Sequence, residues 1–176
     1  MQYLFSKIPI LYSACFINHN IDIHGGDPMN YRIGTKEDIP VMAEIRKQQL
    51  IDEGISPDIN IDEELLRYFD DKLSDGSLVE WLLEDNNKIV ATAAILFLEL
   101  PPTYTNRSGI RGYITNMYTA PAYRGKGIAT SMLEKLIEEA RSRCVNKIFL
   151  GASSLGKPVY KKFGFMEKDQ WMELDL

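Results

Sequence analysis

A glycine-rich run, Arg124-Gly125-Lys126-Gly127-Ile128-Ala129, holds the groups in this sequence best suited to binding an anion. A predicted strand ending at Thr119 precedes it, and a predicted helix follows. The first N–H groups of a helix lack intrahelical partners and lie at the positive end of its dipole, so they attract phosphate. The two glycines have no Cβ to keep phosphate oxygens away from the backbone, and the arginine and lysine add charge. The run predicts a phosphate site; an ordinary glycine-containing loop is the alternative.

Two common nucleotide-binding motifs do not fit this run. A P-loop needs four residues between its first glycine and Gly-Lys-Ser/Thr, and Gly125-Lys126-Gly127 lacks that spacing. A dinucleotide-binding turn needs a third glycine where Thr130 stands and an acidic residue about 20 positions later, where Asn146 and Lys147 lie. Neither a P-loop nor a Rossmann site is therefore expected.

The run and its flanks resemble the GNAT superfamily of N-acetyltransferases. That family carries Arg/Gln-x-x-Gly-x-Gly/Ala at a strand-to-helix turn, and residues 124–129 match each fixed position. The segment 116–121, Asn-Met-Tyr-Thr-Ala-Pro, resembles the family's fourth strand and its proline. The segment 160–165, Tyr-Lys-Lys-Phe-Gly-Phe, resembles its Tyr-x-x-x-Gly-Phe element. The resemblance covers about residues 30–176, with the motifs in the family's order.

The resemblance implies that acetyl-CoA is the co-substrate and that the glycine-rich turn holds its pyrophosphate. It also implies that the fourth and fifth strands diverge, so that pantetheine enters the gap and pairs with backbone like an additional strand. Ser153 stands where many relatives carry asparagine, which leaves its cofactor contact open. The expected cofactor-binding residues are Met117, Tyr118, Thr119, Arg124, Gly125, Lys126, Gly127, Ile128, Ala129, Thr130 and Ser153.

Tyr160 is the expected catalytic residue, because in this family a tyrosine at that position commonly protonates the departing thiolate. A phenol and a thiol have reference pKa values within about two units, which makes the transfer plausible. The alternative is a tyrosine that packs on the core beside Phe163 and Phe165. A general base is missing from strand 113–119, which has no carboxylate. A water relay, Glu80 or Glu99 could deprotonate the amine, although both glutamates could equally be solvated strand ends.

The hydrophobic pattern predicts an α/β (α+β) fold, which the resemblance specifies as a twisted, mostly antiparallel sheet flanked by about four helices. Strands are expected at 31–33, 78–84, 88–98, 110–119 and 147–151, followed by a final strand pair ending at 174. Helices are expected from a capping box at 35–38 to about 54, at 61–76, from 128 and at 155–162. The loop 99–109 contains two prolines and is long enough to have a function.

Composition limits the domain number, the partners and the cellular location that we expect for this chain. Its 176 residues suit one domain, and a formal net charge of -5 argues against nucleic-acid binding. No apolar run approaches the ~20 residues that span a bilayer. Cys15 and Cys144 have no disulfide spacing, and Cys15, His19 and His24 match no zinc pattern, so we expect no metal and a cytoplasmic location. The sequence leaves the oligomeric state open, with a homodimer among the options.

Residues 1–28 are expected to be an appendage, and 29–176 the domain that carries the motifs. The apolar segment 8–17 lacks both the charged lead and the cleavage site of a signal peptide, and 24–28 reads as a loop.

The first two predicted helices are rich in acids, which would attract a cationic amine or simply form a solvated face. These acids are Asp52, Glu53, Asp58, Asp62, Glu63, Glu64, Asp70, Asp71 and Asp75. We therefore expect transfer of acetyl to a primary amine of a small molecule or peptide. A non-catalytic module of the same fold that senses acyl-CoA is the alternative, and an interaction domain without a ligand would leave the glycine turn unexplained.

Overall fold

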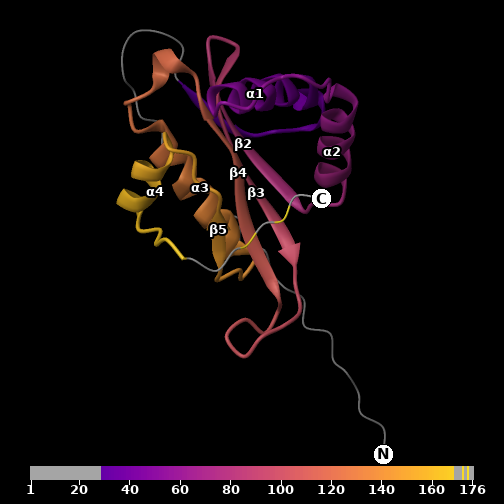
Figure 1. The fold of residues 1–176 in the computed structure, drawn as a ribbon, viewed down its shortest axis with the longest axis vertical. Coiled ribbons are helices and arrows are strands. Elements are labelled where there is room, and N and C mark those ends of the chain that lie inside the picture. The colour runs from indigo at the N-terminus through magenta and orange to yellow at the C-terminus, as the bar shows by residue number, and fades with distance from the viewer. Residues whose placement is uncertain (1–28, 169–171, 173, 175–176) are drawn as a thin grey trace, which may run out of the picture.

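The computed structural model describes residues 29–168, Met172 and Leu174 (Figure 1). Its elements follow the predicted order closely. They are β1 (Asn30–Ile33), the 3-10 turn η1 (Lys36–Asp38), α1 (Ile39–Asp52), α2 (Asp62–Ser74), β2 (Leu78–Asp85), β3 (Lys88–Glu99), β4 (Ile110–Thr119), the 3-10 turn η2 (Pro121–Tyr123), α3 (Ile128–Ser142), β5 (Ile148–Leu150) and α4 (Lys157–Phe163).

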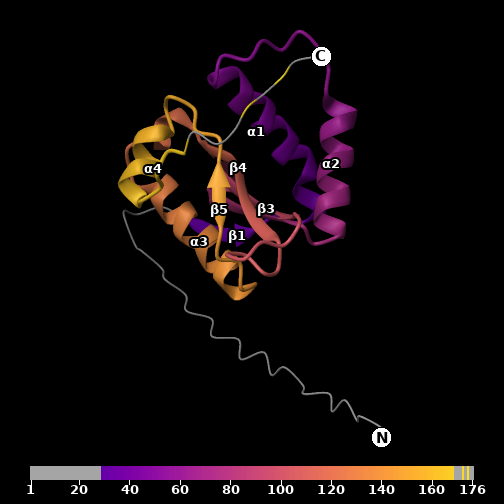
Figure 2. The ribbon, with the colours of Figure 1, turned by 60° about the horizontal axis from the view of Figure 1, so that its bottom comes forward.

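The five strands form one sheet in the order β1-β2-β3-β4-β5. The first three pairings are antiparallel, and β4 pairs with β5 in parallel. This last pairing covers only Gly112–Ile114 of β4, against the whole of β5. Within the described part of the chain, residues 115–119 of β4 pair with β3 alone. The predicted divergence of the fourth and fifth strands is thus confirmed, and Figure 2 shows β5 beside β4.

Helices cover both faces of the sheet, with α1 and α2 on one side and α3 and α4 on the other (Figure 1). Each side has its own apolar cluster. The alternation of β3 assigns its side chains to them, because Ala93 and Ile95 pack toward the α3 side and Ala94 toward the α1 side. A strand buried on both faces reads as a continuous apolar run, as this one does.

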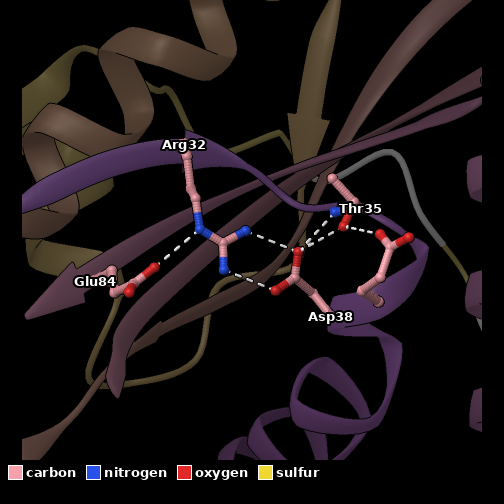
Figure 3. Close-up of polar contacts among 5 residues, drawn as sticks. Arg32, Thr35, Asp38 and Glu84 are labelled. Atoms are coloured by element: carbon pink, nitrogen blue, oxygen red, sulfur yellow. Dashed lines mark hydrogen bonds and ion pairs between the residues drawn. The ribbon is translucent and has the colours of Figure 1, made fainter. Parts of the chain in front are cut away.

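A group of polar contacts joins β1, β2 and the start of α1 (Figure 3). The Arg32 guanidinium donates two hydrogen bonds of 2.7 Å to the Asp38 carboxylate and one of 2.9 Å to Glu84. Arg32 holds the pKa of Asp38 at about 2. The Asp38 carboxylate also accepts from the backbone N–H of Thr35 at 2.8 Å, as the predicted capping box requires. This network fixes the entry into α1.

The differences from the predicted elements lie near the C-terminus. The strand β5 is shorter than 147–151, and α4 begins at Lys157, so that Pro158 falls in the first turn, where its missing N–H costs little. Residues 165–168 form no strand, and most of the remaining segment up to 174 lies outside the described residues. Residues 1–28, with Cys15, His19 and His24, also lie outside them. In the described part no helix is long and apolar enough to cross a membrane, and no metal-binding cluster occurs.

Candidate functional site

A cavity of about 760 Å³ lies where β4 loses its second neighbour. One wall is the unpaired half of β4, and a second is the glycine-rich turn with the first residues of α3. The loop after β5 and the helix α4 form a third wall, and the C-terminal half of α1 forms the fourth. Of the residues named as cofactor-binding or catalytic, all except Lys126 line this cavity, so elements far apart in sequence meet here.

The glycine-rich turn has the backbone that its composition suggests. Gly125 and Gly127 have φ angles of 77° and 81°, a left-handed conformation that L side chains rarely adopt. A Cβ added at either glycine would meet no atom within 4 Å, so both face open space. Gly127 caps α3. The N–H groups of Ile128 and Ala129 lie in the first turn of this helix, where no earlier helical carbonyl is available to accept their hydrogen bonds. The turn therefore presents free donors to the cavity, as a pyrophosphate site requires.

The two basic residues of the turn behave differently from each other. Arg124 lines the cavity, where its Nε donates to the Thr119 carbonyl at 2.9 Å and its guanidinium forms an ion pair with Asp52 of α1. Lys126 does not line the cavity, and its Nζ lies 5.0 Å from the centre of the ring of Tyr123, which does. The predicted cofactor role of Lys126 therefore requires its flexible side chain to turn toward the cavity.

A β-bulge interrupts β4 beside the cavity. Its pairing with β3 shifts between Thr92 and Ala94, and Asn116 has a φ of 51°. The Asn116 carbonyl accepts a hydrogen bond of 2.8 Å from the Thr92 hydroxyl, and its side-chain amide donates one of 3.0 Å to Glu80. Bulges re-aim side chains and end regular pairing. Here the bulge lies immediately before Met117, Tyr118 and Thr119, the three residues predicted to pair with pantetheine.

Glu80 lies behind this bulge and does not line the cavity. It is 1% exposed, and burial raises its pKa to about 8 despite the Asn116 hydrogen bond and the nearby Arg46, which both lower it. A carboxyl with that pKa is mostly protonated at neutral pH. Glu99, the other candidate base, stands at the exposed end of β3 and does not line the cavity either. The structure therefore brings neither glutamate directly to the acceptor amine.

Tyr160 lines the cavity and is 8% exposed. Its ring packs close to Gly156, where an added Cβ would lie 2.8 Å from the ring, and makes an edge contact with Phe165. Burial, with smaller contributions from Glu53 and Tyr113, raises its pKa to about 12. The phenol and thiol pKa values thus differ by more than the reference values suggested, because the phenolate is poorly solvated here. Tyr160 stays protonated and can donate a hydrogen bond.

Ser153 is in the cavity wall, but its hydroxyl accepts a hydrogen bond of 3.2 Å from the Gly156 N–H. Part of its role is therefore to support the start of α4.

Of the residues that α1 and its C-terminal end contribute to the cavity wall, only two acids, Asp52 and Glu53, were predicted from the sequence. Arg46 and Gln49 also line the cavity, one helical turn apart. Gln49 is 7% exposed and donates to Glu53 at 3.0 Å, whereas the apolar side chain of the next residue, Leu50, is only half-buried. In the sequence, polar residues at positions 46, 49 and 53, spaced three and four apart, were the available signal that this face of the helix meets a polar site.

Comparison with known proteins agrees with this architecture. Residues 43–165 match the family described as "Acetyltransferase (GNAT) family". A solved structure of a predicted acetyltransferase with acetyl-CoA from Clostridium acetobutylicum is 59% identical, with a TM-score of 0.83, over 84% of this chain and 96% of that one.

Two curated relatives are glucosamine 6-phosphate N-acetyltransferases. The protein from Trypanosoma brucei brucei is 30% identical over 93 residues, which cover 53% of this chain and 61% of that protein, so the match spans less than two thirds of its length. The protein from Oryza sativa subsp. japonica is 28% identical over 155 residues, covering 85% and 90% of the two chains.

Proposed function

The chain belongs to the GNAT acetyltransferase family, and from that premise we propose that it transfers an acetyl group from acetyl-CoA to a primary amine of a small molecule or peptide. One observation carries the proposal. The glycine-rich turn, the unpaired half of β4 and Tyr160 meet in a single cavity. A donor-rich turn for pyrophosphate, a free strand edge for pantetheine and a protonated phenol are the groups that acyl-CoA chemistry needs.

The roles of the residues follow from their positions. The backbone N–H groups around Gly127 bind the pyrophosphate, and Met117 to Thr119 hold pantetheine as an added strand. Acetyl-CoA supplies the acetyl group as a thioester. Before the attack, the ammonium proton of the acceptor leaves through solvent, because β4 has no carboxylate and the two acids of the cavity wall, Asp52 and Glu53, are engaged with Arg124 and Gln49. The acceptor nitrogen forms a bond to the acetyl carbon while the carbon–sulfur bond breaks, and Tyr160 donates its phenolic hydrogen to the departing sulfur. The proton that the nitrogen loses on becoming an amide then returns through solvent to the Tyr160 oxygen.

The two curated relatives support glucosamine 6-phosphate as the first acceptor to test. Its amine is primary and its phosphate is anionic, two properties that suit a cavity with both acidic and basic lining residues.

We further propose that residues 29–176 form the catalytic domain, that 1–28 are dispensable, and that the enzyme works in the cytoplasm, where the exposed thiol of Cys144 would stay reduced. A chain beginning at Met29 should keep its fold and acetyl-CoA binding. Aggregation of that chain beside a well-behaved full-length protein would show that the appendage packs on the core. Light scattering would also show whether the enzyme is a homodimer.

The activity is tested by following free thiol released from acetyl-CoA over a panel of small amines and peptides. Release with at least one amine, and identification of its acetylated product, are expected. Acetyl-CoA binding without release for any amine would instead favour a non-catalytic acyl-CoA-binding module. No binding of acetyl-CoA would reject both functions.

A further inference from the structure

Arg46 holds a charge in the cavity that the protein itself leaves unbalanced. Four charged residues line the cavity: Arg46, Asp52, Glu53 and Arg124. Arg124 and Asp52 form an ion pair, and Glu53 accepts a hydrogen bond from Gln49. Among the described residues, Arg46 forms no hydrogen bond or ion pair, although it comes from the middle of a well-packed helix.

The buried acid Glu80 does not neutralise Arg46. Arg46 lowers the pKa of Glu80, so the two charges affect each other, yet they form no ion pair. Glu80 nevertheless keeps a pKa of about 8 and is mostly protonated at neutral pH. Arg46 is always charged. A cationic side chain on a cavity wall beside an uncharged acid is suited to pairing with an anion from outside the protein.

Gln49 gives a second, independent sign that this wall is incomplete. Its Nε2 donates to Glu53, but its Oε1 is buried and has no hydrogen-bond donor among the described residues. A buried polar atom without a partner is unfavourable, so most such atoms in native proteins are satisfied by water or a ligand. Because the oxygen is closed off from solvent, a hydroxyl or amine of a bound acceptor reaches it only when the Gln49 amide turns toward the cavity that the residue lines.

The contrast with Arg32 shows how this protein treats an arginine whose role is structural. Arg32 is half-buried, like Arg46, but its guanidinium makes three hydrogen bonds to Asp38 and Glu84 (Figure 3). Arg46 has no such partners. A fold that needed Arg46 only for packing would not require a charged group on the wall of the cavity.

We propose that Arg46 and Gln49 form the acceptor subsite, with Arg46 binding an anionic group, a phosphate or a carboxylate, on the same molecule that carries the amine. This inference rests on the proposed function and narrows its substrate class to amines that also bear an anion. Arg46 would then determine specificity, and Tyr160 and the glycine turn would act on any acceptor.

The test uses pairs of acceptors that differ only in the anion. Glucosamine and glucosamine 6-phosphate test the phosphate, and a free amino acid and its amide test the carboxylate. Both kcat/KM and the affinity for the protein–CoA complex, by titration calorimetry, are measured for the full chain. The variant is Arg46→Gln. The matched control is Lys47→Gln, which removes the same charge from the next residue of α1, where Lys47 is paired with Glu44 and Asp62 outside the cavity.

The wild-type protein should prefer the anionic member of one pair, and that pair identifies the anion. Arg46→Gln should reduce kcat/KM and affinity for that member by about 10- to 100-fold, the range for losing a hydrogen bond to a charged group. The uncharged member, the KM for acetyl-CoA and the Lys47→Gln control should change little. If Arg46→Gln does not fold, Arg46→Lys is tested in its place. It should keep part of the preference for the anionic acceptor, because lysine retains the charge but lacks the planar guanidinium that donates two hydrogen bonds at once.

The absence of any anion preference in the wild-type protein would overturn the proposal, as would an equal loss for both members of a pair in Arg46→Gln. Calorimetry separates this failure from failure of the proposed activity. Preferred binding of the anionic amine without thiol release would keep the subsite and reject the transferase, whereas thiol release without preference would do the reverse.

Discussion

The two halves of β4 differ in their neighbours, and their difference explains where the function lies. Residues Gly112–Ile114 are paired on both sides, with β3 and β5. The packing there is close at Gly112, where an added Cβ would lie 2.7 Å from the end of the buried Ile95 side chain and force it to shift. In the part of the chain that the structure describes, residues 115–119 pair only with β3, and they line the cavity. One half of the strand therefore stabilises the sheet, and the other offers unpaired backbone groups to a ligand.

Two local features produce this difference. The strand β5 has only three residues, so its pairing with β4 ends at Ile114. The bulge at Asn116 then shifts the register of the remaining strand. The glycine-rich turn follows after the short η2, and both it and the unpaired half of β4 line the cavity.

The largest expected effect comes from blocking the glycine-rich turn that is proposed to bind the pyrophosphate. Gly127→Glu adds a side chain at a φ of 81° and a negative charge at the turn, so acetyl-CoA binding should be abolished. Acetyl-CoA at 100 times its dissociation constant should stabilise the wild-type fold by about 2.7 kcal/mol, and the variant by nothing. Thermal melting with and without the ligand measures this.

Gly76→Glu is the matched control for that variant. Gly76 has a φ of 72° and equally open space, but lies outside the cavity. This control should suffer a similar backbone strain and still respond to acetyl-CoA. An undiminished ligand shift in Gly127→Glu would mean that the pyrophosphate does not bind at this turn.

The next largest effect concerns proton donation by Tyr160, which lines the cavity beside the unpaired half of β4. Tyr160→Phe keeps the ring that packs against Gly156 and removes only the hydroxyl. Turnover should fall by about 10²- to 10⁴-fold with acetyl-CoA affinity nearly unchanged, the range for loss of a general acid. Tyr31→Phe, a half-buried tyrosine outside the cavity, should leave turnover intact. A small drop in melting temperature with full turnover would assign Tyr160 to the core and the proton donation to solvent or another group.

A smaller effect tests the buried acid behind the bulge. Glu80 has a folded-state pKa of about 8 against a usual 4.5, so between these values the folded protein keeps a proton that the unfolded chain has lost. Stability should therefore fall as pH rises, by up to ~1.4 kcal/mol per pH unit over this window. Urea unfolding from pH 5 to 8 should show this slope in the wild type and in Glu99→Gln, and a flatter one in Glu80→Gln. Equal slopes in all three would place the titration elsewhere.

The smallest effect concerns the contact between α1 and the turn. Asp52 forms an ion pair with Arg124 and so competes with a pyrophosphate for the same guanidinium. Asp52→Asn should tighten acetyl-CoA binding by about two- to fivefold, as expected for a partly exposed pair. Titration calorimetry measures it against Asp58→Asn, an exposed acid outside the cavity. Weaker binding in Asp52→Asn would show that Asp52 instead positions Arg124 for the ligand.

The strand and the turn beside the cavity could be predicted from the sequence because their signals are local, whereas the divergence of β4 from β5 was expected from the resemblance to the family. The strand bounds at 110–119 and the turn at 124–129 follow from β-branched runs, glycine spacing and the start of a helix. Gln49 and Arg46 could not be placed in the same way, since their position depends on how α1 packs across the sheet. The buried state of Glu80 was also missed, because β2 is covered on both faces and its alternation does not say so.

The most direct test of the central claim is amide hydrogen exchange on the full chain, with and without saturating acetyl-CoA. The account predicts that exchange slows in 115–119 and 125–130 when acetyl-CoA binds, because the ligand supplies the partners that this half of β4 lacks. Residues 112–114, already paired on both sides, and the β1–β2 pairing should exchange at the same rate in both states. Unchanged exchange in 115–119 at saturation, or protection confined to another part of the chain, would contradict the account.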